Sequence, residues 1–189
     1  RGLHPNTEAY PEVGEIDLIC ARDGVVLVIE VKSSFRRRSQ REAWLHGKTT
    51  LRKAGQQLRR KVAAINRMLE TPSSKEMELG LSSNCSAYGI IADTSFEHDH
   101  ERFNGFLKVS IEEILIALRD DHELLIDPIC ILGEGYGLPS TSSPTKEQTQ
   151  ETLYPGGFNA QRFIEVLEND LVWLEFDLRA KEQMNPRIH

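Results

Sequence analysis

The stretch GEIDLICARDGVVLVIEVK, Gly14 to Lys32, decides the fold because it holds two strand-forming runs joined by a short turn. The runs Gly14 to Ala21 and Val25 to Lys32 are rich in Ile, Leu and Val, which favour β-strands. Between them, Asp23-Gly24 is a favoured two-residue hairpin turn, since Gly accepts a positive φ and Asp tolerates one. The sequence therefore predicts a β-hairpin.

A turn at these two residues also fixes the register of the hairpin. It places Asp17 opposite Glu30, and Glu15 opposite Lys32, on one face. Opposed Cβ atoms lie about 4.5 to 5.5 Å apart, and like charges placed this way destabilise a sheet. Because the rest of both runs is apolar, we expect both faces to be buried, and a divalent cation would then offset the cost of burying two carboxylates. The alternative is a charge pair at the exposed end of an edge strand.

The rest of the chain alternates between helical and strand patterns. From Thr49 to Leu69, apolar residues recur at helical spacing, at Leu51, Ala54, Leu58, Val62, Ile65 and Leu69. Ser86 to Ala92 and Phe106 to Val109 are typical of strands, and Ser110 is a helix cap with Glu113 at the capping-box position. This alternation predicts the α/β class.

Composition divides the chain into three parts. Residues 1–132 form the predicted core, residues 133–157 are rich in Gly, Pro, Ser and Thr and predict a flexible linker, and residues 158–189 predict a C-terminal helix. That helix has an apolar stripe, which is typical of a core or partner face and would allow a homo-oligomer: Phe163, Leu167, Leu171, Leu174 and Leu178. The chain starts at Arg1 rather than Met, so we also expect that further domains could precede it.

Charge is distributed unevenly along the chain. The formal net charge is -6, yet Lys32 to Lys61 holds eleven Lys and Arg against one acid, Glu42. Such a cluster can bind a nucleic-acid backbone despite an acidic total, although a solvated helix face is equally consistent with it.

Several functional classes find no support in the sequence. No apolar run reaches the roughly 18 residues of a membrane span, and the first residues lack a secretory pattern, so we expect a soluble intracellular protein, cytoplasmic or nuclear, without a membrane partner. No Ser-His-Asp order, Walker loop or Rossmann fingerprint is present. His98-Asp99-His100 lies in a polar run, and adjacent loop histidines are more often solvated than bound to metal.

The segments GEID, Gly14 to Asp17, and EVK, Glu30 to Lys32, resemble the acidic and (D/E)XK motifs of the PD-(D/E)XK nucleases, especially restriction-endonuclease-like and Holliday-junction-resolvase-like members. The resemblance extends in element order to about Arg119. It implies a restriction-endonuclease-like mixed β-sheet flanked by helices, here with a C-terminal helical appendage, and a metal-dependent nuclease that cuts DNA or, as the less favoured substrate, RNA. A catalytically inactive nucleic-acid-binding or assembly module is the alternative, and the intact Asp, Glu and Lys set favours the enzyme.

The resemblance also implies roles for individual residues. Asp17 and Glu30 would ligate Mg²⁺ or Mn²⁺ together with the Val31 carbonyl, and Lys32 would position or deprotonate the attacking water. Hard oxygen ligands suit Mg²⁺, and a lysine beside it would stabilise charge at phosphorus. Family members usually have a helix before the hairpin that often carries a further acid. Only thirteen residues precede Gly14, so that helix would lie upstream of Arg1, be degraded or be replaced by the C-terminal segment. Glu15 shares the face of Asp17 and could supply the missing carboxylate.

Some members carry a glutamine in the following helix and a Lys or Tyr four residues later. Gln57 and Lys61 fit this spacing, Gln56 and Arg60 fit it almost as well, and each pair shares a helix face that could reach the site. Ordinary solvent-facing helix residues would look the same. The candidate contacts to a nucleic-acid backbone are Arg36, Arg37, Arg38, Lys53, Arg60 and Lys61.

Overall fold

A mixed five-stranded sheet forms the centre of the computed structural model, which describes residues 14–33, 37, 39–73, 77, 81–121 and 152–174. Its strand order is β1-β2-β3-β5-β4. The strands are β1 (Leu18–Arg22), β2 (Val25–Lys32), β3 (Ser86–Asp93), β4 (Arg102–Phe103) and β5 (Phe106–Ser110). The pairs β2–β3 and β3–β5 are parallel, whereas β1–β2 and β4–β5 are antiparallel. Helices flank this sheet, which confirms the α/β class.

The first two strands form the predicted hairpin. Their register runs from Leu18 opposite Ile29 to Arg22 opposite Val25, as a turn at Asp23-Gly24 requires. Both turn residues have positive φ, 52° for Asp23 and 76° for Gly24. The first strand begins at Leu18, later than its apolar composition indicates.

The prediction that both faces of the hairpin are buried is wrong for β1. Leu18 is 50% exposed, and Cys20 is also exposed, whereas Ile19 on the other face is buried. Within the described residues β1 is an edge strand, so its outward side chains have little to pack against. By contrast, β2 lies between two strands and is buried from Val25 to Glu30.

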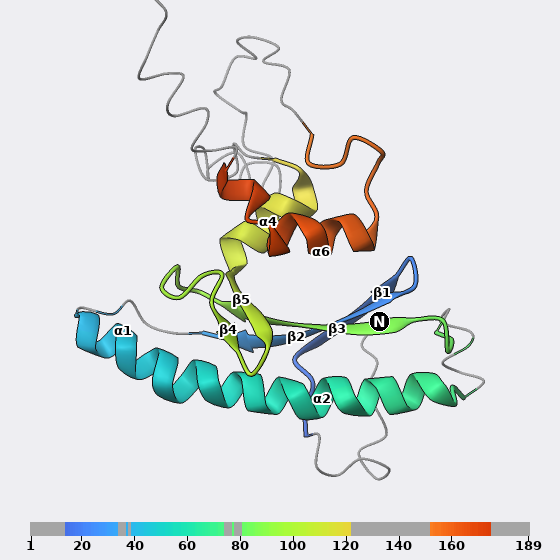
Figure 1. The fold of residues 1–189 in the computed structure, drawn as a ribbon, viewed down its shortest axis with the longest axis horizontal. Helices are drawn as coiled ribbons and strands as arrows, with labels where there is room; N and C mark the ends of the chain where they lie inside the picture. Colours follow the sequence, from blue (N-terminus) through green and yellow to red (C-terminus); the bar gives the residue numbers. More distant parts are fainter. Residues whose placement is uncertain are drawn as a thin grey trace, which may run out of the picture.

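One face of the sheet is covered by a long, nearly continuous helical segment (Figure 1). It consists of α1 (Gln40–His46), the π-helical turn η1 (Gly47–Leu51) and α2 (Arg52–Glu70). The helical spacing predicted from Thr49 to Leu69 is confirmed, and the helical segment starts earlier than predicted. The apolar face of α2 packs on the hairpin and β3 in a core that includes Ile19, Val26, Val28, Leu51, Ala54, Leu58, Ile65 and Ile91.

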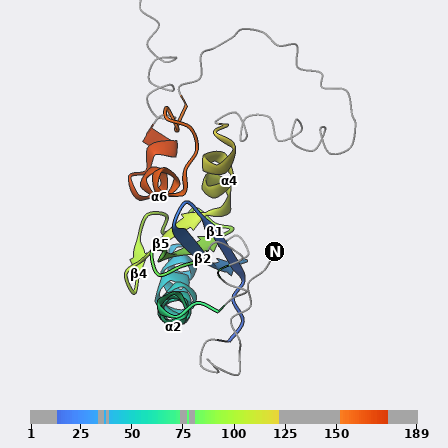
Figure 2. The same ribbon diagram turned by 90° about the vertical axis from the view of Figure 1, so that its right-hand side faces the viewer.

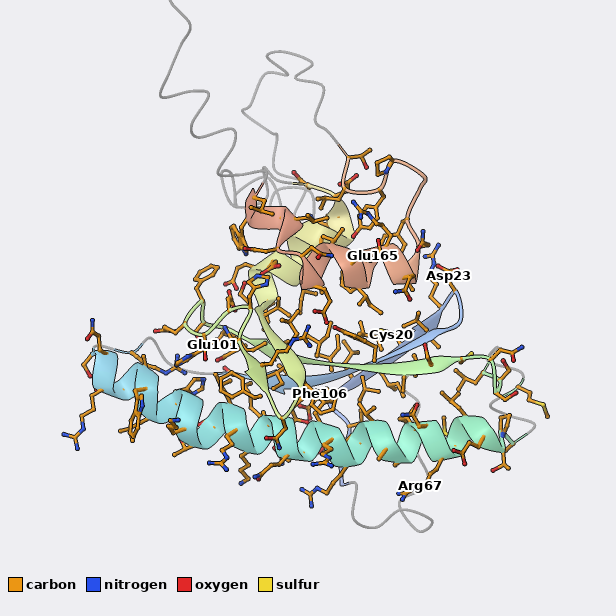
Figure 3. The ribbon with its side chains drawn as sticks, in the orientation of Figure 1. Cys20, Asp23, Arg67, Glu101, Phe106 and Glu165 are labelled. Carbon is orange, nitrogen blue, oxygen red and sulfur yellow. The ribbon has the colours of Figure 1, made fainter. Side chains whose placement is uncertain are left out.

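Two shorter helices, α4 (Ile111–Arg119) and α6 (Ala160–Glu168), cover the opposite face, so helices lie on both sides of the sheet (Figure 2). Ser110 caps α4, as predicted, by accepting a hydrogen bond from the Glu113 amide. The side chain of Asp23 at the hairpin tip lies beside the start of α6 and accepts a hydrogen bond from the Ala160 amide at 3.1 Å (Figure 3).

The C-terminal segment contributes to this second core. Phe163 and Leu167 of α6 are buried in it, and so are Leu153 and Tyr154. These two residues fall near the end of the linker predicted for 133–157, and their side chains pack in the same core as α4. Residues 122–151 and 175–189, and with them Leu178 and most of the linker, lie outside the described residues. Leu174 is 51% exposed.

No helix among the described residues is long and apolar enough to cross a membrane.

Candidate functional site

Four charged side chains meet at the open end of the hairpin, and we call them the hairpin cluster: Asp17, Glu30, Lys32 and Lys61. Lys61 Nζ, from α2, donates a hydrogen bond to Glu30 Oε2 and lies 3.9 Å from Asp17 Oδ1. Lys32 Nζ donates to Glu30 Oε1 at 2.5 Å. Both oxygens of Glu30 therefore accept from a lysine.

The register explains how the carboxylates come together. Asp17 directly precedes β1, and its Oδ2 accepts a hydrogen bond from the Val31 amide at 2.7 Å, so its side chain binds the backbone of β2 just beyond the strand pairing. Glu30 lies on the sheet face that α2 covers, because its neighbours at alternate positions, Val26 and Val28, belong to the α2 core. Lys61 therefore reaches Glu30 from α2, the helix that covers this face of the sheet.

The hairpin cluster is buried on one side and open on the other. Glu30 is 2% exposed and Lys61 is 3% exposed. The side chains of Asp17 and Lys32 are 31% and 22% exposed. Burying the Glu30 carboxylate is tolerated here because two ammonium groups balance it, and the open side leaves Asp17 and Lys32 partly exposed to solvent.

The other predicted site residues differ in how far their side chains are exposed. Glu15 is exposed, Val31 is 38% exposed and Gln57 is half-buried. Lys53 and Arg60 are exposed on α2, as a backbone-binding role requires. Lys61 is different: it is buried and bound to Glu30, so it lies at the site that its spacing from Gln57 allowed it to reach.

The arginine run is only partly described, because Arg36 and Arg38 lie outside the described residues. Arg37 binds Glu97, with its Nη1 2.8 Å from Oε2, and its Nη2 lies 4.0 Å from Asp93 Oδ2. Its side chain is 8% exposed. This arginine is therefore held against the protein.

A second polar group lies next to the hairpin cluster and has no counterpart in the sequence-based predictions. Asp93, paired in register with Lys32, is fully buried and accepts from Ser95 Oγ at 3.0 Å. Its Oδ2 also lies 2.7 Å from His46 Nε2. Burial lowers the pKa of His46, against the hydrogen bond with Asp93, which raises it. The alternating pattern of β3 placed Asp93 on the same face as Glu30, but nothing in the sequence indicated its partner on α1.

The polar run 97–101 is also more ordered than a solvated loop. His98 Nε2 lies 2.9 Å from the Ala43 carbonyl, and Asp99 binds the buried Lys108 at 2.5 Å. Burial raises the pKa of Asp99 to about 6, although the hydrogen bond from Lys108 opposes the rise. His100 faces Glu113 and Asp170 at 3.0 Å each. The expectation of solvated histidines is therefore wrong, because this turn packs between α1 and the α4–α6 layer.

No family model, curated protein or solved structure matches this chain.

Proposed function

We propose that this chain is a metal-dependent nuclease of the PD-(D/E)XK type that hydrolyses phosphodiester bonds in DNA. The observation that carries the proposal is the convergence of Asp17 and Glu30 on one lysine, with Lys32 bound to the second oxygen of Glu30. Two carboxylates and two lysines at one open end of a buried hairpin supply oxygen ligands and positive charge in the same place.

The donor set fits Mg²⁺ or Mn²⁺. Asp17 Oδ2 is engaged by the Val31 amide, whereas Oδ1 is 3.9 Å from the nearest lysine nitrogen in the hairpin cluster, beyond hydrogen-bond range. Asp17 and Glu30 would hold the cation, because such ions take one or two carboxylates and otherwise bind water and substrate phosphate. When bound, the cation would polarise a phosphoryl oxygen and lower the pKa of a bound water.

The lysines of the hairpin cluster have separable tasks. Lys61 is buried and holds Glu30 from α2 through a hydrogen bond to Oε2. Lys32 is 22% exposed at its side chain and lies at the end of β2, so its ammonium group can reach a substrate phosphate and stabilise the charge that grows there during attack. Glu30 holds Lys32 in place through the 2.5 Å hydrogen bond.

A basic helix face supports nucleic acid as the substrate. Lys53, Arg59, Arg60 and Arg67 of α2 are exposed, and Arg67 lies on the side of the helix turned away from the sheet (Figure 3). Each backbone phosphate that such a cation neutralises displaces a counterion, which makes binding depend on salt. A face of this kind binds the backbone without reading sequence.

The deciding experiment incubates the protein with circular and linear DNA in Mg²⁺, in Mn²⁺ and in EDTA. Cleavage with either cation and none in EDTA is expected. Glu30→Gln should abolish it, whereas Glu165→Gln, which changes an exposed acid on α6, should leave it intact. A wild-type protein that binds DNA but cuts neither DNA nor RNA with any divalent cation would instead be a binding or assembly module.

A further inference from the structure

Three side chains from distant parts of the sequence meet on the other side of the molecule, and we call them the histidine cluster: His100, Glu113 and Asp170. His100 belongs to the turn before β4, Glu113 to α4, and Asp170 to the turn after α6. One donor atom from each lies within 4.8 Å of those of the other two. None of the three belongs to the hairpin cluster, so this feature is independent of the proposed nuclease function.

The hydrogen bonds within the histidine cluster leave it incompletely satisfied. His100 Nε2 can carry one hydrogen, yet it lies 3.0 Å from Glu113 Oε2 and 3.0 Å from Asp170 Oδ1. Glu113 Oε2 already accepts from Trp173 Nε1 at 2.8 Å. Within the described part of the chain, Glu113 Oε1 is buried without a hydrogen-bond partner, and Glu113 as a whole is fully buried. A buried carboxylate oxygen without a donor costs free energy that a cation would recover.

The neighbouring cations are engaged elsewhere. Lys108 binds Asp99 and the Ser95 carbonyl, and Arg102 binds Glu168 and the Gly105 carbonyl. Among the described residues, Glu113 is therefore left with one imidazole and one indole N–H as partners. A buried carboxylate in this setting favours a bound cation.

We propose that His100, Glu113 and Asp170 form a binding site for Zn²⁺. One imidazole and two carboxylates are donors that zinc accepts, whereas Mg²⁺ prefers oxygen and water alone. Donor atoms around a tetrahedral zinc ion stand roughly 3.3 to 3.6 Å apart, so the 3.0 Å contacts of Nε2 need only a small separation. The side chains of His100 and Asp170 are 23% and 44% exposed, which gives the ion a path from solvent and room for a water as fourth ligand.

The surroundings assign the zinc ion a structural role. Trp173 donates to Glu113 Oε2 and also packs edge-on against Phe96, with ring centroids 6.0 Å apart, so it helps to orient the carboxylate. The ion would join the turn before β4, α4 and the end of α6. It would thereby hold the C-terminal helix on the sheet.

The test measures thermal unfolding of the full, untagged chain after EDTA treatment and dialysis, with Zn²⁺ added in the absence of other metals. At free zinc about 100 times Kd, the midpoint should rise by roughly 5 to 10 °C. His100→Ala should lose this rise, and so should Asp170→Asn, which preserves shape at a partly exposed position. His98→Ala is the matched control, because His98 is two residues away and bonds Glu101 and Ala43 instead.

A second readout separates the two carboxylate clusters. Co²⁺ in place of zinc should give the visible absorption of a four-coordinate site with one ion per chain, and Glu30→Gln should leave that spectrum unchanged. If the wild type shows neither the midpoint rise nor the spectrum, the histidine cluster is only a hydrogen-bonded ion group and the proposal fails. It also fails if His100→Ala and Asp170→Asn keep the full response, or if Glu30→Gln alone removes it.

Discussion

The hairpin cluster and the histidine cluster both contain one Asp and one Glu side chain, but the groups that bind these carboxylates differ. In the hairpin cluster, Asp17 and Glu30 face two lysines, and Glu30 accepts from both. In the histidine cluster, two carboxylates share a single imidazole. The first set already holds two ammonium groups, whereas the buried Glu113 of the second keeps one oxygen without a hydrogen-bond donor among the described residues.

The difference shows how partners, rather than carboxylates, select chemistry. A lysine cannot ligate a metal while it is protonated, but it can neutralise a phosphate, so the hairpin cluster suits an oxygen-bound cation together with a phosphodiester. An imidazole can ligate a metal directly, so the histidine cluster suits zinc. Four predictions can break or sharpen this contrast.

The largest expected effect follows from removing the exposed lysine of the hairpin cluster. Lys32→Ala should lower the rate of DNA cleavage by about 10² to 10⁴-fold, because it removes a group that acts on the transition state. Affinity for DNA should fall only a few-fold, since the exposed basic face of α2 supplies most ground-state binding. Single-turnover cleavage and equilibrium binding separate the two quantities.

Arg119→Ala is the control for loss of a positive charge, because Arg119 is an exposed cation at the end of α4, a helix on the opposite face of the sheet from the hairpin cluster. Equal losses of cleavage rate and of DNA affinity in Lys32→Ala would show that this lysine only binds the DNA backbone.

The buried lysine should matter more for stability. Lys61→Met removes one partner of a pair in which Glu30 is 2% exposed and Lys61 is 3% exposed. Leaving a buried carboxylate with one partner fewer should lower the free energy of unfolding by about 3 kcal/mol, measured by urea denaturation. Arg60→Met on the exposed face should change it by less than about 0.5 kcal/mol.

In the double variant Glu30→Gln/Lys61→Met, much of the lost stability should return, because no unbalanced charge is left buried. A double variant as unstable as the sum of its parts would mean that the two residues act independently.

The contrast also shows what the sequence could predict. Asp23-Gly24 fixes the hairpin, and the alternation along β2 then places Asp17, Glu30 and Lys32 together, because local turn chemistry determines a register over a few residues. The helical spacing of α2 brought Lys61 to the same face of its helix as Gln57, but its burial depended on how α2 crosses the sheet.

Turn chemistry and helical spacing could not predict the histidine cluster. His100 and Asp170 are far apart in sequence, and their contact exists only because α6 docks beside α4 and ends next to the turn before β4. The sequence predicted Glu113 to lie at a capping-box position, yet its carboxylate binds His100 and Trp173. Tertiary packing decided the partners of all three side chains.

Metal exchange tests the contrast directly and should give a smaller effect than loss of Lys61. Asp17→Asn should lose the rise in unfolding midpoint that Mg²⁺ produces and keep the rise that Zn²⁺ produces, whereas His100→Ala should show the reverse. Each loss should correspond to at least about tenfold weaker binding, the scale seen when a metal site loses supporting contacts. A variant that loses both responses would show that the two clusters are not separate sites.

The smallest expected effect concerns His46, whose imidazole lies against the Asp93 carboxylate. Here burial lowers the pKa of the histidine by more than this one acid raises it. His46 faces Asp93, with Arg37 and His98 nearby, and the net result is a lowered pKa. The unfolded chain takes up a proton near the ordinary value of 6.5, whereas the folded protein does so only at lower pH. Stability should therefore be full above pH 6.5 and decline as the pH falls from 6.5 through the folded pKa.

His46→Gln keeps a side chain that can bond Asp93 but cannot titrate, so its stability should decline less over this range, whatever its stability at neutral pH. Urea denaturation of both proteins between pH 5 and 8 measures the difference in slope, and other titrating groups cancel in that difference. If the two slopes are equal, His46 binds its proton as readily in the folded protein as in the unfolded chain. Asp93 would then offset the effect of burial in full, and one carboxylate would be enough to hold the pKa of a buried histidine at its ordinary value in this fold.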